Sequence, residues 1–354
     1  IIGAGIAASG TFALGGGVSV VTVNDETLAS IGDNADVEAG GDVSVLASDD
    51  SSLTIVTGGV GIGVGGAGIG ASVGIGLFDK TTDALIGANA SIDAKGTGAL
   101  GYDDILTGAV GGDGSFTRGT GAHGVILQAD STESFTNISF AGAAGVYAGI
   151  AGAVGVTVID SDTTAQIGNN AQINQGSGDY AVPANGVDPD QAVWVGASNR
   201  VSLNQFTLGF AGGIAGIAGA VSIGRIVNDV NASIGTGADV RARHAVEVNA
   251  LSDKSLTGFT LSRAGGVVGL GASVSVFSLG SSFDQMYEDD EGNSDDALEG
   301  DGSGDGENTA AGEANKQSDN SAGQVGDSLG DLQGEDADAN PNTKDSRANT
   351  GIGL

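Results

Sequence analysis

The sequence TGGVGIGVGGAGIGASVGIGLFDKTTDALIGANASIDA, residues 57–94, decides how this chain folds. It begins with an uncharged run, residues 57–78, in which glycine is the commonest residue. The run is long enough to cross a bilayer as a helix, since about 20 apolar residues suffice. However, each glycine inside a helix costs roughly 1 kcal/mol relative to alanine. The composition therefore argues against a transmembrane helix.

The order of the residues in this run predicts β-strands. Apolar residues alternate with glycine over residues 60–64, and after Gly65-Gly66 the alternation continues over residues 67–77 with its phase shifted by one. A period of two is typical of strands. Paired glycines at the phase shift indicate a turn or a bulge. A flexible linker would lack the ordered branched residues.

The stretch is one copy of an internal repeat. The Ile-Gly pairs of successive copies are separated by 55, 81 and 67 residues, and leaving out poorly matching inserts near 96–123 and 176–190 gives a unit in the low fifties. We therefore expect about four to five repeats within residues 1–282. The four copies are ASIGDNADVEA (29–39), ALIGANASIDA (84–94), AQIGNNAQINQ (165–175) and ASIGTGADVRA (232–242).

Each unit consists of short runs rich in Val, Ile and Thr, separated by clusters of Gly, Asn and Asp that are typical of turns. No span of helical periodicity is long enough to cover a sheet. A repeat that cannot bury its own apolar face gains stability by stacking on copies of itself. The sequence therefore predicts an all-β solenoid, with the Val and Ile positions filling its interior and small residues on the other face.

The composition excludes several classes of protein. Aromatic residues make up 4%, there are 66 glycines and no cysteine, and the formal net charge is -32. The absence of cysteine excludes a disulfide-stapled scaffold. A chain this acidic is not expected to bind nucleic acid or anionic lipid by charge, and it attracts cations.

The acidic residues concentrate near the end of the sequence. Residues 284–347 contain 19 acidic and three basic residues, which is half of the net charge. Such a segment buries too little apolar surface to offset the entropy lost on ordering. We expect residues 283–349 to be a disordered acidic insertion and residues 350–354 to start the next repeat, so that the sequence is a piece of a longer protein.

The repeat resembles a known family of exoproteins. The pattern A-x-I-G-x-x-A-x-V/I-x-A, combined with G-D-V-x-V-x-A and with Gly-rich apolar stretches, is similar to the large repetitive adhesins of Gram-negative bacteria, both filamentous-haemagglutinin-like and leukotoxin-type. The resemblance covers roughly residues 1–282. It implies a right-handed parallel β-helix, exported to the cell surface and acting in adhesion, aggregation or surface structure, in association with the outer membrane.

Few residues point to chemistry. His123 and His244 are the two histidines, and without cysteine or a histidine pair a zinc site is not expected. The chain has no G-x-S-x-G nucleophile motif, and the Gly-rich GVGIGVGGAG lacks the lysine of a nucleotide-binding loop. We therefore expect the two histidines to lie in turns or on the surface and the glycines to lie in strands.

One segment resembles half of a calcium-binding loop. In DGSGDGEN, Asp301, Ser303 and Asp305 stand at alternate positions before Gly306, as in the first half of an EF-hand loop. The twelfth position is glycine, and Glu313 lies one residue late. These three residues are the candidate Ca²⁺ ligands, and a solvated acidic run that holds counterions loosely is the alternative.

A second candidate cation site lies in the repeats. Asp79 and Asp160 each stand seven residues before the Ile-Gly pair of their unit, and Asp162 adds a second carboxylate in the later copy. If the units stack in register, these side chains form a ladder along the solenoid that could hold cations. Solvent-facing turn residues are the simpler interpretation.

Three functions fit these patterns. The first is a non-catalytic stalk or filament wall of a secreted or surface-anchored bacterial protein, which contacts a receptor or glycan of a host or neighbouring cell, or copies of itself. The second is a β-helix enzyme acting on polysaccharide, and the third is a membrane-active toxin in which Gly-rich stretches insert as β-hairpins. We favour the first, with no enzymatic activity and no transmembrane span in this segment.

Overall fold

The computed structural model describes residues 1–98, 101–112, 114–175, 186–280, 286–288 and 294–296. None of these residues is helical, so no described segment is a helix able to cross a membrane. The chain divides into two units, residues 1–280 and 281–354. In the second unit an antiparallel pair, β17 and β18, is described; the remainder of the predicted acidic insertion, and residues 350–354, lie outside the described residues.

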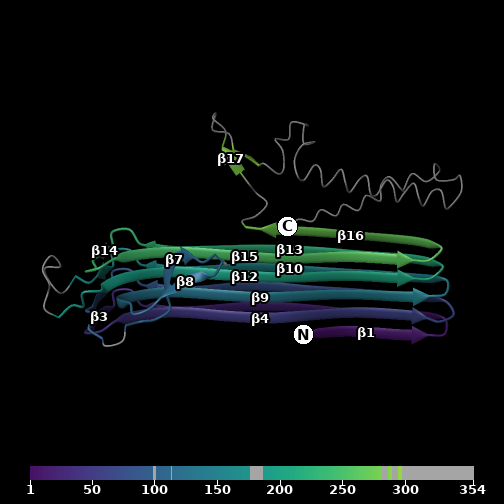
Figure 1. The fold of residues 1–354 in the computed structure, drawn as a ribbon, viewed down its shortest axis with the longest axis horizontal. Coiled ribbons are helices and arrows are strands. Elements are labelled where there is room, and N and C mark those ends of the chain that lie inside the picture. Colours follow the sequence, from purple (N-terminus) through teal and green to yellow (C-terminus); the bar gives the residue numbers. More distant parts are fainter. Residues whose placement is uncertain (99–100, 113, 176–185, 281–285, 289–293, 297–354) are drawn as a thin grey trace. The chain divides into compact units, whose positions relative to one another are not determined.

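The first unit is built from three parallel sheets (Figure 1). Sheet A has the order β1-β4-β9-β12-β15, sheet B the order β16-β13-β10-β5-β2, and the short sheet C the order β14-β11-β6-β3. A separate antiparallel hairpin, β7-β8, follows sheet C in one repeat. The strands are β1 Ile2–Ser9, β2 Phe12–Ile31, β3 Asp36–Ala39, β4 Val43–Gly63, β5 Ala67–Ile86, β6 Ser91–Ala94, β7 Ile105–Val110, β8 Phe116–Gly119, β9 His123–Gly145, β10 Ala148–Ile167, β11 Gln172–Ile173, β12 Gln191–Gly212, β13 Ala215–Ile234, β14 Asp239–Val240, β15 Val246–Gly265, β16 Val268–Leu279, β17 Met286–Glu288 and β18 Ser294–Asp296.

One rung of the stack is a long strand of sheet B, a short strand of sheet C and a long strand of sheet A, and a tight turn then leads to sheet B of the next rung. Neighbouring rungs pair in parallel throughout. This confirms the predicted all-β parallel solenoid. The four Ile-Gly pairs lie in one register, and the predicted turn at Gly65-Gly66 is one of the tight turns; the stacked isoleucines are Ile31, Ile86, Ile167 and Ile234.

The residues after each Ile-Gly pair form the corner between sheets B and C. Asn34, Asn89 and Asn170 have φ of 57°, 56° and 56° there, and Gly237 has φ of 74° in the last copy. Asparagine tolerates this left-handed conformation better than most residues, and glycine adopts it without cost. The backbone N–H of Asn34 also donates to the carbonyl of Ala88 on the next rung (2.9 Å). The I-G-x-N motif is therefore the sequence of a stacked corner.

The end of the rung next to sheet C, hereafter the sheet-C end, has an apolar interior. Strands of all three sheets point branched and alanine side chains into it, as the sequence predicts. Burying each Val, Leu or Ile side chain stabilises the fold by roughly 1.5–3 kcal/mol. The cluster includes Val45, Ala84, Ile86, Ile92, Val125, Leu127, Ile167, Ile173, Val193 and Val195.

Further along the strands a second apolar cluster fills the space between sheets A and B. Phe78 of β5 and Phe135 of β9 stack with ring centroids 3.8 Å apart and an interplanar angle of 19°. Ile55, Ile159 and Leu203 pack around them. Only sheets A and B face each other here, because the short strands of sheet C lie at the other end of the rung.

At the end of the rung next to the tight turns, hereafter the tight-turn end, the prediction that Val and Ile fill the interior is wrong. Gly59, Gly61 and Gly63 of β4 point inward, whereas Val60 and Ile62 point outward. A Cβ on Gly59 or Gly61 would collide with a carbonyl oxygen of β5. Sheets A and B are therefore in backbone contact, and only Gly, Ala and Ser fit between them; the buried alanines are Ala141, Ala143, Ala151, Ala153, Ala211 and Ala218.

The β7-β8 hairpin packs on the outside of sheet A at the sheet-C end. Ile105 contacts Ile126 and Ala122 in a small buried cluster. The amide of Leu106 donates to Gln128 Oε1 (3.0 Å), and Asn249 Nδ2 donates to the carbonyl of Leu106 (3.1 Å). The hairpin is thus fixed to strands of several rungs.

Candidate functional site

A row of carboxylates runs across the outside of sheet B. Asp79 of β5 pairs with Asp160 of β10, and Asp162 pairs with Asp229 of β13. Asp79 and Asp160 of the predicted ladder are therefore in register, but Asn24 and Val227 occupy that level on β2 and β13. Burial raises the pKa of Asp162, and the negative charges of Asp160, Asp229, Asp79 and Asp83 raise it further.

The neighbouring Asp83 behaves similarly. Burial raises the pKa of Asp83 and the charge of Glu26 adds to the effect, while a hydrogen bond with Thr164 opposes it. For both carboxylates burial is the largest cause of the raised pKa, and the like charges nearby add to it. Across the described part of the chain, no three His, Asp or Glu side chains are grouped closely enough to hold a metal ion. Cation binding by the ladder thus remains a prediction.

The candidate calcium ligands Asp301, Ser303 and Asp305 lie outside the described residues. His123 begins β9, and its Nδ1 lies 3.5 Å from Asp42 Oδ1. His244 lies in the turn before β15, where its amide donates to the carbonyl of Gln191 (2.8 Å).

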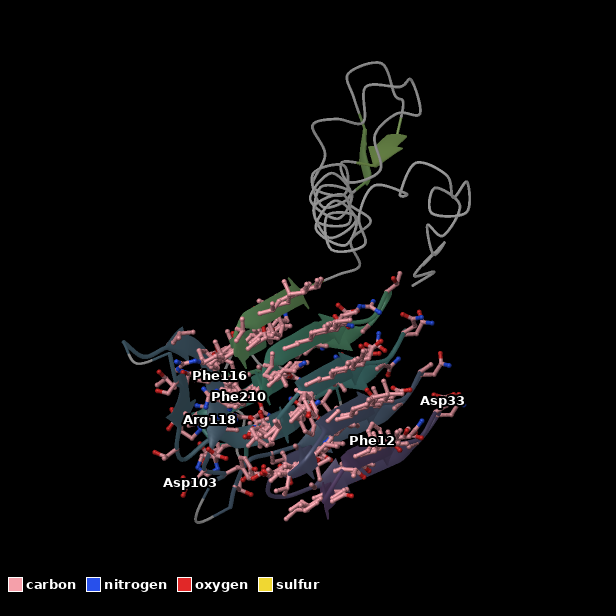
Figure 2. All side chains as sticks on the ribbon, turned by 90° about the vertical axis from the view of Figure 1, so that its right-hand side faces the viewer. Phe12, Asp33, Asp103, Phe116, Arg118 and Phe210 are labelled. Atoms are coloured by element: carbon pink, nitrogen blue, oxygen red, sulfur yellow. The ribbon has the colours of Figure 1, made fainter. Side chains whose placement is uncertain are left out.

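The hairpin and sheet A enclose a small polar cavity of about 90 Å³. Arg118 of β8 makes two hydrogen bonds to Asp130 (2.9 and 3.0 Å). Burial favours loss of the Arg118 charge, but Asp130 outweighs it, so the pKa of Arg118 is raised. Arg200 lies over the Phe116 ring (4.8 Å) and pairs with Asp253 (3.2 Å). Figure 2 shows Phe116 and Arg118 on the same side as Phe210. Both cations are already neutralised, so the cavity offers little charge to an anionic ligand.

A buried ion pair joins sheets A and B between the two apolar clusters. Lys80 of β5 bonds Asp49 and Ser51 of β4, and the side chains of Lys80 and Asp49 are 1% and 8% exposed. Burial alone would raise the pKa of Asp49, but the hydrogen bond and charge of Lys80 outweigh it and the pKa is lowered. The pair links the sheets at one level of the rung.

The same level continues through the stack as a network of buried side chains. Glu133 Oε1 accepts from Ser131 (2.6 Å) and Ser161 (2.7 Å), and Asn199 Nδ2 donates to Ser161 Oγ (2.7 Å). Asn228 links Asn199 to the next rung. Burial raises the pKa of Glu133, partly opposed by its hydrogen bonds. Glu133 Oε2 has no hydrogen-bond partner, so the charged form of this carboxyl is less favoured than that of an exposed glutamate.

A second polar level lies closer to the tight turns. The side-chain Nδ2 of Asn137 donates to the carbonyls of Gly74 (3.2 Å) and Val156 (3.1 Å). The side-chain Nε2 of Gln205 donates to the carbonyls of Gly155 (2.6 Å) and Ile223 (3.0 Å). These bonds join sheet A to sheet B. Around them lie buried hydroxyls without a hydrogen-bond partner, namely those of Ser19, Thr57, Ser72, Ser139, Thr207 and Ser222.

The outside of the tight-turn end is apolar on both sheets. Figure 2 looks onto the tight turns, with Phe12 on sheet B and Phe210 on sheet A. A shallow apolar groove of about 360 Å³ crosses sheet A, where Gly142 and Ala144 of β9 lie between Ile62 and Phe210. Outward residues that are at least 38% exposed include Ile2, Ile6, Leu14, Val18, Val20, Ile62, Val64, Leu77, Ile150, Ile217, Leu261, Leu270, Val274 and Val276.

Comparison of the chain with protein-family models, with curated proteins and with solved structures gave no match. The site must therefore be judged by its geometry. Sequence reasoning found the carboxylate row but missed the Lys80-Asp49 pair and Glu133. Their signal was present, because each stands at the same alternating phase as the buried apolar residues of its strand.

Proposed function

We propose that this chain is a non-catalytic structural and adhesive segment of a secreted or surface-anchored bacterial protein, in which stacked rungs form a stiff wall. The observation that supports this best is the common register of the rungs. Strands of about twenty residues pair in parallel across four rungs, with the Ile-Gly corner at the same level in each, and the shorter β16 continues the pairing. Such a stack gains its stability from contacts between neighbours.

The insert that forms the β7-β8 hairpin is the described segment best placed to contact another surface. The β7-β8 hairpin departs from the rung outline and lies on the outside of sheet A. Adhesion through such inserts needs no reactive group, whereas an enzyme needs catalytic groups beside a substrate cleft. In the described residues the polar cavity beside the hairpin holds about 90 Å³, less than the roughly 300 Å³ or more of typical ligand pockets. The groove of about 360 Å³ on sheet A is large enough, but apart from Arg263 its lining residues are apolar or glycine.

The proposal can be tested by coupling the full chain to beads. We expect the beads to clump or to be retained on cell surfaces or glycan-coated surfaces. We expect the same clumping or retention from a variant that lacks one complete rung, residues 148–214. That deletion joins Tyr147 to Ala215, so a tight turn is restored. Circular dichroism checks that the β structure is kept. A matched deletion of residues 148–181, which removes half a rung, should abolish folding.

Two results would contradict the proposal. Beads that neither clump nor bind at any coupling density would remove the adhesive role. Release of reducing ends from an acidic polysaccharide by the soluble chain would instead favour the enzyme hypothesis. Loss of folding on removal of the complete rung would contradict the role of the rung as a repeated building block.

A further inference from the structure

The tight-turn end has apolar side chains on the outside of both sheets, and we propose that this end inserts into the hydrocarbon of a lipid bilayer with the turns leading. Sheets A and B would both face acyl chains. From the sequence we expected no transmembrane span in this segment, and the proposal differs from that expectation; no helix among the described residues is long and apolar enough to cross a membrane. The inserted part is an already folded pair of sheets, not hairpins that open on contact with the membrane. This binding surface is independent of the adhesive role.

The apolar surface is continuous along the strands. On the middle strand β10 the outward residues from the turn are Ile150, Gly152, Val154, Val156 and Val158. The strands on either side continue the pattern. Exposed apolar patches of monomeric soluble proteins rarely exceed a few hundred Å² and mark binding surfaces when they do. The outward residues beside these are Ile69, Val73, Ile75 and Leu77 on β5, and Ile217, Val221 and Ile223 on β13.

The length of this surface matches a bilayer. From Ala67 to Leu77 the strand advances about 33 Å at roughly 3.3 Å per residue, and the hydrocarbon core of a bilayer is about 30 Å thick. Outward polar residues end the apolar surface on both sheets, at Asp79 and Asp160 on sheet B and at Thr54, Thr136 and Asn204 on sheet A. A polar boundary on each of two opposite faces is expected of an object that crosses an interface.

Backbone groups of the tight turns form hydrogen bonds within the protein, as an apolar solvent requires. Hydrocarbon offers no hydrogen bonds, so each peptide group must find a partner within the protein. The amide of Tyr147 donates to Gly66 O (3.0 Å), that of Ile214 to Val146 O (3.1 Å) and that of Val267 to Ile214 O (2.9 Å). Successive turns therefore satisfy one another. The outermost strands have a neighbour on one side only and leave peptide groups unpaired, so the proposal concerns the rungs between them, and the test uses β10, which is paired on both sides.

Lipid fits this surface better than a second copy of the chain. A second copy packed on one sheet would leave the other sheet and the turns exposed. The apolar surface encloses both faces and includes the turns, where Val64, Val146 and Val267 are 68%, 52% and 85% exposed. Tyr147, also in a turn, is 65% exposed and is a residue type enriched at membrane interfaces.

Two charges lie within or beside the apolar surface of the described strands. Arg225 pairs in register with Val158, at the boundary. Arg263 pairs with Phe210 on the outermost strand of sheet A. Long arginine side chains can reach toward an interface while their stems stay in apolar surroundings. Because the chain carries a net charge of -32, the bilayer used as a probe should be zwitterionic.

The absence of cysteine makes a direct test possible. Single variants Val154→Cys, Val158→Cys and Gln166→Cys of the full chain, all outward on β10, are labelled with an environment-sensitive fluorophore and reconstituted into phosphatidylcholine vesicles. Lipids that carry quenchers at known depths report the position of each label. We expect strong blue-shifted emission and deep quenching at position 154, shallow quenching at 158 and none at 166.

A charge provides the second measurement. Val154→Asp should lower the fraction of chain that floats with the vesicles at least tenfold, whereas Gln166→Asp, the matched change on the same strand, should leave it unchanged. Circular dichroism confirms that both variants are folded. The labels also remain informative if Val154→Asp does not fold.

Three outcomes would overturn the proposal. The first is a label at position 154 that stays in water while folded chain and vesicles are present together. The second is equal quenching at 154 and 166, which shows adsorption without the predicted depth. The third is protection of position 154 that depends on protein concentration without lipid, because that result assigns the surface to a second copy of the chain.

Discussion

The two ends of each rung are built on opposite plans. At the sheet-C end the interior is apolar, with Ile167 fully buried, and the outside carries the carboxylates of Asp160 and Asp162. At the tight-turn end of the same strand the interior is glycine and alanine, and Ile150 is 42% exposed outside. Both patterns alternate with a period of two. One strand can therefore bury its large residues at one end and its small residues at the other.

The difference shows that alternation alone does not identify the inner face. The phase of the apolar residues switches where two of them stand side by side. Such pairs are Ile55-Val56 in β4, Leu77-Phe78 in β5 and Val158-Ile159 in β10, with one member outside and one inside. Leu77 and Val158 are also paired in register. The stacked pairs mark the level at which the solenoid changes from one plan to the other.

We expect the largest effect on unfolding free energy from a comparison of two isoleucines of β10. Ile167→Ala should cost about 2–5 kcal/mol of unfolding free energy, because it leaves a cavity in the apolar interior of the sheet-C end. Ile150→Ala, the same change at the tight-turn end, should cost less than about 1 kcal/mol in water. Chemical denaturation followed by circular dichroism measures both. Equal costs would show that the two ends are not built on opposite plans.

Alanine substitutions at two glycines of β10 test how closely sheets A and B pack at the tight-turn end. Gly149 points inward, and a Cβ there would collide with Gly212 of sheet A, whereas a Cβ on Gly152 meets nothing within 4 Å. We expect Gly149→Ala to destabilise by about 1–3 kcal/mol through overpacking. Gly152→Ala should be neutral or slightly stabilising, because alanine reduces the entropy of the unfolded chain. The same denaturation experiment measures the unfolding free energy of both variants. If Gly149→Ala does not lower it, the two sheets can move apart at little cost.

The smallest expected effect concerns Glu133, at the level between the two plans. The pKa of Glu133 is raised by burial, so its contribution to stability is complete below its usual value of 4.5 and is lost as the pH rises through the raised pKa. Glu133→Gln stays neutral and should gain about 1 kcal/mol over the native chain at pH 7 but little at pH 4. Exposed Glu38→Gln is the control. A gain that does not vary with pH would contradict the assignment.

Much of the fold could be predicted from the repeats. The Ile-Gly pairs gave the register, the alternation gave the strands and Gly65-Gly66 gave a turn, because each is a local pattern. The Lys80-Asp49 pair could not be predicted in the same way, since its partners are 31 residues apart and belong to different sheets. The contact of Gly59 with Ala71 is likewise invisible in the sequence, because it depends on the distance between sheets.

The connections between strands differ in the lengths they allow. The tight turns always join sheet A to sheet B through two or three residues, whereas the connection from sheet C to sheet A holds three residues after β3 and a long insert with its own hairpin after β6. Foreign peptides or reporter domains should therefore be accepted in place of residues 101–121. A peptide grafted there would stand on a rigid support, which makes the chain a scaffold for displaying epitopes at defined spacing.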